Sequence, residues 1–100
     1  MNISGTELTD ALAHRLTVSD EALMVDLADG RTITVPLVWF PRLAHGSATE
    51  RGNRRLIGGG EGIHWPDLDE DISVDSLLAG RRSGETPESF RRWLDARKTG

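Results

Sequence analysis

The sequence predicts an α+β fold, in which a small antiparallel β-meander is combined with short helices and a C-terminal amphipathic helix. Two alternating segments flank Asp29-Gly30, and an Asp-Gly pair favours the positive φ angles of a type I′ hairpin turn. Near the C-terminus, apolar side chains recur at helical spacing. A chain of 100 residues has room for one core, so we expect a single domain over residues 1–100.

The meander is expected over residues 15–35, where apolar and polar side chains alternate on both sides of the Asp-Gly turn. The strand after this turn, 31–37, carries Ile33 and Val35 on one face and β-branched threonines on the other. A preceding strand over 15–18 completes the three-stranded meander.

Short helices and tight turns are expected after the meander. Pro36 lacks a backbone N–H and is expected at a strand end, followed by a short helix or turn over 37–45. Ser47 is a candidate N-cap for a helix that begins near Ala48. The glycine-rich run 58–62 predicts a tight, flexible loop.

Three weaker elements complete the pattern. A short amphipathic helix is expected over 5–13, and residues 63–65 are expected as one more short strand. A second short helix begins at Ser73 or Asp75 and ends at Gly80, a residue type favoured just after a helix.

The C-terminal helix, about 86–98, has the strongest local signals. Thr86 is the expected N-cap, and it is followed by a proline at the first helical position. Phe90, Trp93 and Leu94 form one apolar stripe, so we expect the helix to pack onto its own domain or onto a second copy. The second case would make the protein a homo-oligomer through this helix.

Composition excludes several classes of protein. The chain has no cysteine, which excludes disulfides and thiolate metal sites. Its first residues lack the basic and apolar regions of a signal peptide, and no apolar stretch approaches the ~20 residues of a membrane span, so a cytoplasmic protein without membrane association is expected. The net charge of −4 argues against nucleic acid as the main partner.

Charge is unevenly distributed along the chain. Residues 61–75 hold six acids and no Lys or Arg, whereas residues 81–100 hold six bases and three acids. These are either two solvated faces or an acidic loop that meets a basic partner. A DNA-binding surface on the C-terminal helix is a weaker alternative; its candidate residues are Arg91, Arg92, Arg97 and Lys98.

The run of aspartates resembles a calcium loop only in part. Asp67, Asp69 and Asp71 match the first three liganding positions of an EF-hand, but Ile72 and Leu78 stand where glycine and a bidentate glutamate are needed. No metal site is therefore expected. The glycine run lacks the Lys and Ser or Thr of a phosphate-binding loop, so no cofactor is expected either.

An enzyme remains the alternative reading. His64, Asp67, Asp69 and Glu70 contain the residue types of a small metal-dependent hydrolase or nuclease. The other histidines share no ligand or triad spacing with His64, so a structural histidine that caps the turn is preferred.

An aromatic segment beside an arginine suggests a binding surface. Trp39, Phe40 and Arg42 are residue types common at interface hot spots. We expect one of the two rings to fill the core while the other covers it, or is exposed for a partner.

Two long strings carry a family resemblance over about residues 14–80: DGRTITVPLVWFPRL at 29–43 and GIHWPDLDEDIS within 50–80. They resemble the bacterial family called domain of unknown function 2442. The resemblance implies a small α+β domain without an established activity, and it suggests pairing of the toxin–antitoxin type. Arg54 stands where an aromatic residue is common in the family, which puts any family contact by that side chain in doubt.

The favoured function is that of a small non-catalytic module that binds a protein partner. The partner is expected to have a basic surface. An antitoxin-like role, as one member of a toxin–antitoxin type pair, is one form of this function. The candidate binding residues are Trp39, Arg42, His64, Trp65, Asp67, Asp69 and Asp71.

Overall fold

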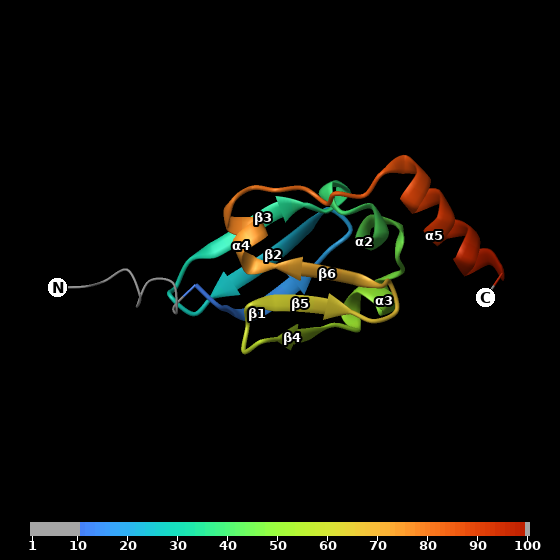
Figure 1. The fold of residues 1–100 in the computed structure, drawn as a ribbon. Helices are drawn as coiled ribbons and strands as arrows, with labels where there is room; N and C mark the ends of the chain where they lie inside the picture. Colours follow the sequence, from blue (N-terminus) through green and yellow to red (C-terminus); the bar gives the residue numbers. More distant parts are fainter. Residues whose placement is uncertain (1–10, 100) are drawn as a thin grey trace.

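The computed structural model, which describes residues 11–99, contains two three-stranded antiparallel sheets packed face to face (Figure 1). The first sheet has the strand order β1-β2-β3, with bounds Ala13–Val18, Ala22–Leu27 and Thr32–Pro36. The second has the order β4-β5-β6, with bounds Arg55–Ile57, Gly62–Trp65 and Glu70–Ser73. Buried side chains of both sheets form one hydrophobic cluster, so the core lies between them.

Short helices connect the sheets and cover their ends. A 3₁₀ turn η1 (Leu37–Trp39) and the helices α2 (Pro41–His45) and α3 (Ala48–Gly52) lead from the first sheet to the second. Helix α4 (Val74–Leu78) follows β6, and α5 (Pro87–Thr99) lies beyond α2 at one end of the molecule (Figure 1). Within residues 11–99, no helix has the length and apolar character required to cross a membrane.

The predicted meander and α+β fold are confirmed. Strand β2 pairs with β3 in the register that sets Leu23 opposite Val35, and all of β1 through β3 lies close to the expected bounds. The turn type differs from the prediction, because Gly30 has a φ of +96° but Asp29 does not have positive φ. Hydrogen bonds from Leu27 N–H to Arg31 O and from Gly30 N–H to Leu27 O close a three-residue loop.

Most of the predicted caps are confirmed. Pro36 is the last residue of β3, and Ser47 forms a reciprocal capping box with Glu50 at the start of α3. Helix α4 is capped by the Ser73 hydroxyl, which accepts from the N–H of Ser76, and not by Asp75.

Two strands are absent from the sequence-based prediction. The second sheet was represented only by residues 63–65, whereas β4 and β6 flank that strand on both sides. Strand β4 has no buried side chain to mark it, and β6 lies within the acidic run. The predicted helix over 5–13 falls largely outside the described residues, although Ala13 begins β1 and is not helical.

The C-terminal helix packs against its own domain. Trp93 contacts the hydrophobic cluster, while Phe90 stacks on Trp93 at 5.6 Å between ring centroids and meets the edge of His45 at 6.2 Å. The Thr86 hydroxyl accepts from the N–H of Ser89, as expected of the N-cap. Phe90 and Trp93 of the predicted apolar stripe therefore contact the chain's own body.

Candidate functional site

The turn between β5 and β6, residues 66–69, is called the acidic turn here. It follows the Trp65–Glu70 pair that ends the ladder, and its Leu68 side chain is completely buried in the core. Asp69 adopts a φ of +51°, a conformation that costs energy in most non-glycine residues. Its side chain is 87% exposed, so the turn directs one apolar side chain inward and a carboxylate outward.

The backbone of the acidic turn is held by side chains from two helices. Three successive carbonyl oxygens each accept a hydrogen bond from α2 or α5. The donor and acceptor pairs are Trp93 Nε1 to Leu68 O at 3.0 Å, Arg42 Nη1 to Asp69 O at 2.9 Å and Arg97 Nη1 to Asp67 O at 3.4 Å. These contacts fix the backbone and leave the aspartate carboxylates largely in solvent.

Arg42 is bound within the chain and does not project as a free anchor. Its Nε and Nη2 donate to the two carboxylate oxygens of Glu85 at 2.5 and 3.1 Å. Only 18% of the Arg42 side chain and 7% of the Glu85 side chain are exposed. The hydrogen bond from Arg42 holds the pKa of Glu85 below its ordinary value, and the Ser89 hydroxyl also donates to this carboxylate. Arg42 thus connects α2 to the segment before α5, and its role as a binding residue for a partner stays a prediction.

The aromatic candidates divide between core and surface. Trp65 is completely buried and donates through Nε1 to Arg51 O at 3.0 Å, so it cannot touch a partner, contrary to the prediction. Phe40 fills the core, as expected for one of the two rings. Trp39 is partly buried, with the Arg82 guanidinium 5.0 Å from its ring centroid.

His64 does not cap the turn, which corrects the preferred reading of this residue. It lies in β5 directly opposite Asp71 in β6, and its Nδ1 is 2.5 Å from Asp71 Oδ1. Arg55 of β4 is its other neighbour in the ladder, so a basic residue, a histidine and a carboxylate share one outer face of the second sheet. The Asp71 side chain is 68% exposed.

Glu70 lies on the opposite face of the sheet from His64, because it pairs with the buried Trp65. Burial raises the pKa of Glu70 to about 7. The positive charge of Arg42 lowers this pKa, whereas the negative charges of Glu85 and Asp71 raise it further. Glu70 is also one of the residues that line a cleft of about 460 Å³.

The residues of the alternative enzyme reading do not converge. His64 and Glu70 face opposite sides of one sheet, while Asp67 accepts a hydrogen bond from Asn53 at 2.9 Å. Across residues 11–99, no cluster of three or more His, Asp or Glu side chains is placed to hold a metal ion. Among the described residues, the four side chains of the alternative enzyme reading are therefore not gathered at one point.

Glu70 makes the stability of the fold depend on pH. Its pKa is about 7 in the folded chain against an ordinary 4.5, so the folded chain binds more protons between these values. The free energy of unfolding should therefore fall by about 1–2 kcal/mol as pH rises through this window, allowing for partial solvent screening. Denaturant titrations at pH 5 and pH 8 measure this slope. Glu70→Gln should lose it, and a slope retained in that variant would contradict the assignment.

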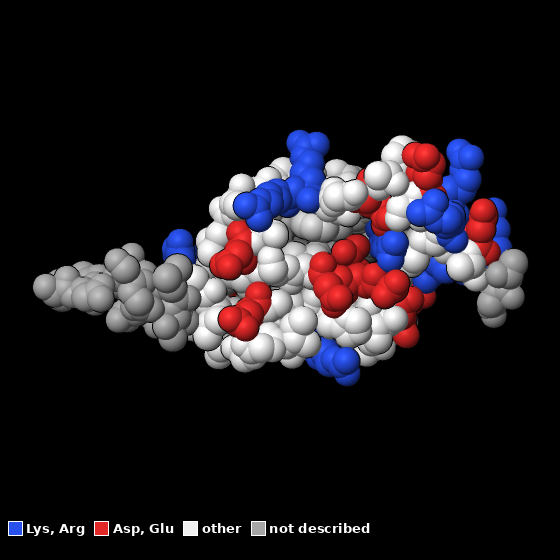
Figure 2. All heavy atoms as spheres, in the orientation of Figure 1, with Lys and Arg blue, Asp and Glu red and all other residues white. Residues whose placement is uncertain are grey.

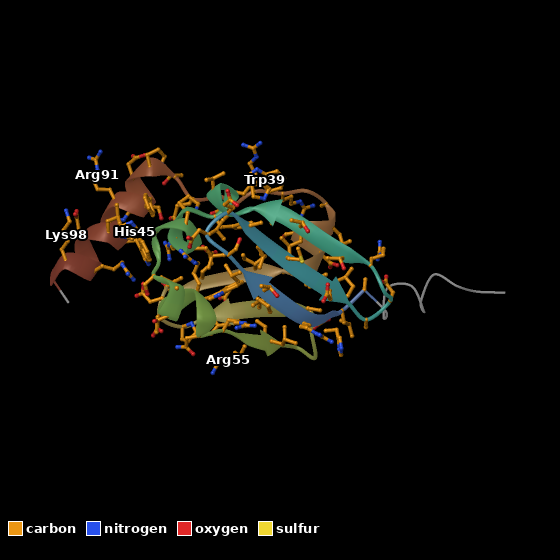
Figure 3. The ribbon with its side chains drawn as sticks, turned by 180° about the vertical axis from the view of Figure 1, so that it is seen from behind. Trp39, His45, Arg55, Arg91 and Lys98 are labelled. Atoms are coloured by element: carbon orange, nitrogen blue, oxygen red, sulfur yellow. The ribbon has the colours of Figure 1, made fainter. Side chains whose placement is uncertain are left out.

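Some basic side chains of α5 are bound within the chain, while others project into solvent. Arg97 donates to both carboxylate oxygens of Glu50 at 2.9 and 3.0 Å, and it stacks 4.6 Å from the Trp93 ring. Arg91 and Lys98 project away from the body (Figure 3). Of the four bases considered for DNA binding, Arg97 is thus engaged within the chain.

Sequence patterns did not reveal which side chains hold the acidic turn and Arg42. Glu85 was seen only as a member of a charged segment, Arg97 only as a base of the C-terminal helix and a candidate for DNA binding, and Trp93 only as part of an apolar stripe. Arg42 and Glu85 are 43 positions apart, and no local spacing connects them.

Comparison with known proteins identifies related sequences and folds. The sequence profile of a family described as "Protein of unknown function (DUF2442)" matches residues 13–83. This segment contains both sheets and the acidic turn, and it ends before α5. A search of curated proteins finds no match.

Two solved structures are similar to this chain. A crystal structure of a protein of unknown function from Rhodospirillum rubrum is 29% identical, with a TM-score of 0.63 over 74% of this chain and 92% of that one. A solution NMR structure of an uncharacterised protein from Chromobacterium violaceum is 17% identical, with a TM-score of 0.65 over 82% and 77% of the two chains. The second likeness concerns the fold alone.

Proposed function

Since this chain belongs to the DUF2442 family of proteins of unknown function, we propose a function from its own surface: it is a non-catalytic module that binds a basic protein partner through the acidic turn. The observation that carries this proposal is the contrast between the backbone and the side chains of the turn. The three carbonyls of residues 67–69 are anchored from behind, while the Asp69 carboxylate is 87% exposed.

Such an arrangement lowers the cost of binding. A turn that is already fixed loses little conformational entropy when a partner docks, so more of the contact energy appears as affinity. The positive φ of Asp69 supports the same view, because backbone strain is often retained where a loop is held in a functional shape.

The charge around the turn favours a basic partner. Figure 2 shows carboxylates gathered over the ends of β5 and β6 that carry the turn; the exposed acids there are Asp67, Asp69 and Asp71. Exposed charges of one sign steer an oppositely charged partner and raise its association rate more than they raise affinity. Arg55 and His64 border this surface and would select the orientation of the partner.

The antitoxin-like role that the resemblance suggested is one specific form of this proposal. A toxin whose basic surface is covered by the acidic turn would have the required chemistry. Identification of the protein that co-purifies with this chain at native expression separates that form from other protein pairs. A detected hydrolytic activity that is lost in the turn variants would instead support the enzyme alternative.

The test removes two carboxylates without altering shape. Asp69→Asn with Asp71→Asn should lower the association rate with the native partner about tenfold at low salt, and much less at high salt. Asparagine tolerates the left-handed conformation of residue 69, so the turn should persist. Surface plasmon resonance across a salt series measures both rate constants.

A matched control changes the net charge by the same amount elsewhere. Glu21 and Glu88 are exposed and lie outside the acidic turn, so Glu21→Gln with Glu88→Gln should leave association close to that of the wild type. Equal rates for all three proteins would place the binding surface elsewhere.

A further inference from the structure

The 3₁₀ turn η1 presents an apolar side chain to solvent at some distance from the acidic turn. Leu37 is 1% exposed and fills the core, whereas the next residue, Val38, is 75% exposed. A single exposed valine is ordinary on a protein surface. What sets this one apart is the adjacent Trp39, whose ring lies against the Arg82 guanidinium.

Trp39 is held in place beside Val38. Its carbonyl oxygen accepts from the N–H of Ser83 at 3.0 Å, which ties the segment after α4 across η1. The guanidinium of Arg82 then lies 5.0 Å from the centroid of the Trp39 ring. Figure 3 shows Trp39 at the edge of the molecule, well away from Arg91 and Lys98 on α5. Val38, Trp39, Arg81 and Arg82 are together called the tryptophan ledge.

In the described part of the chain, the two arginines of the ledge are not ion-paired, in contrast to four others. Arg31, Arg42, Arg51 and Arg97 each form an ion pair with a carboxylate. Within residues 11–99, neither Arg81 nor Arg82 has an ion-pair partner, and both are exposed. Figure 2 shows basic side chains at the edge of the molecule above the acidic groups, over the segment that follows α4.

We propose that the tryptophan ledge is a second interaction surface, which binds an acidic protein segment carrying an aliphatic side chain. A carboxylate of that segment accepts from Arg81 and Arg82, since guanidinium groups present paired donors that match a carboxylate. The aliphatic side chain packs against Val38 and Trp39, where desolvation strengthens the ion pair beside it.

The ledge fits a protein segment better than a nucleic acid. Nucleic-acid surfaces need a longer stripe of basic residues to follow the phosphate backbone. Here the basic surface is short, because Glu70 and Asp71 line the same cleft of about 190 Å³ as Arg81 and Arg82. The apolar component from Val38 also has no role in binding phosphates.

This inference goes beyond the proposed function, because the two surfaces have opposite charge and are built from different segments. A protein with both can hold a basic partner at the acidic turn and an acidic segment at the ledge. Binding of a basic partner at the acidic turn and binding of an acidic segment at the ledge are therefore tested independently, and either proposal can be contradicted while the other is supported.

The test uses a fluorescein-labelled synthetic peptide of glutamate and leucine, with a glutamine and leucine peptide as the uncharged control. Fluorescence anisotropy should show that the wild type binds the acidic peptide and not the control peptide. Arg81→Glu with Arg82→Glu should weaken this binding at least about tenfold, the order expected when a bidentate ion pair becomes a repulsion. Val38→Ser should weaken it by a smaller factor.

Two matched variants make the result specific. Arg91→Glu with Arg92→Glu has the same change of net charge on α5 and should bind within about twofold of the wild type. Asp69→Asn with Asp71→Asn should also retain binding. Equal loss in the α5 variant, or no loss in the ledge variant, would overturn the proposal.

A second measurement locates the peptide directly. In a ¹H–¹⁵N correlation spectrum, the indole N–H signal of Trp39 should shift on addition of the acidic peptide. The signals of Trp65 and Trp93, whose N–H groups donate to Arg51 O and Leu68 O, should remain in place. A shift of Trp93 in place of Trp39 would locate the peptide on α5 and contradict the proposal.

Discussion

Trp65→Ala is expected to destabilise the fold by about 3–5 kcal/mol, the range measured for large aromatic side chains removed from well-packed cores. Trp65 is 0% exposed and lies between the two sheets, where its removal would leave a cavity that rigid strands cannot fill. The change also removes the indole donor to Arg51 O. A carbonyl that stays buried after the loss of this donor adds a further cost.

Chemical denaturation monitored by far-UV circular dichroism measures this loss. Trp65→Phe keeps most of the apolar volume but not the indole N–H, so it should lie between the wild type and Trp65→Ala. Trp93→Ala is the matched control on α5, where the ring is only partly buried, and it should cost about 1–2 kcal/mol. If Trp65→Ala costs no more than Trp93→Ala, the core does not depend on the second sheet as described.

Gly60→Ala is expected to cost about 3 kcal/mol or more, through backbone strain and a direct clash. Gly60 has a φ of +112°, which disfavours any side chain. A Cβ atom there would lie 2.5 Å from Ala13 O and 3.1 Å from Ala13 N. The same residue accepts the Ala13 N–H at 2.8 Å, so the clash falls on the hydrogen bond that joins the β4–β5 hairpin to β1.

The neighbouring glycine provides the control for this prediction. Gly59 also has a positive φ, +68°, but a Cβ atom there would meet nothing within 4 Å. Gly59→Ala should therefore show the strain alone, about 1–2 kcal/mol. Thermal unfolding of both variants separates the two contributions, and equal destabilisation would show that the contact with Ala13 is not close.

Sequence patterns predict the first sheet well and the second sheet poorly, for a physical reason. Strand β2 alternates over Leu23, Val25 and Leu27, which all face the core, so its period is visible over the whole strand. Strand β4 has only three residues, and all of them are exposed. Its place in the sheet is set by hairpin pairing with β5 across the glycine-rich turn, and three exposed residues carry no alternation from which a strand could be predicted.

The candidate site shows the same division. The exposed acids were predicted correctly as surface groups, because polarity alone determines that outcome for Asp67 and Asp69. Trp65 was predicted to bind a partner together with the acidic residues that follow it. The register of β5 instead turns it inward, opposite to the neighbouring His64. Successive residues of a strand face opposite sides of the sheet, so the direction of a side chain depends on its position in the strand and not on the composition of the segment.

The contacts between α5 and the acidic turn have a consequence for proteolysis. Arg81 and Arg82 are exposed in the segment that joins α4 to α5, where a trypsin-like protease would find two cleavage sites. A single cut there would separate Glu85, Trp93 and Arg97 from the part of the chain that contains both sheets. The family-matched sheets would keep their own core, but the acidic turn would lose the covalent connection to the side chains that hold it in shape.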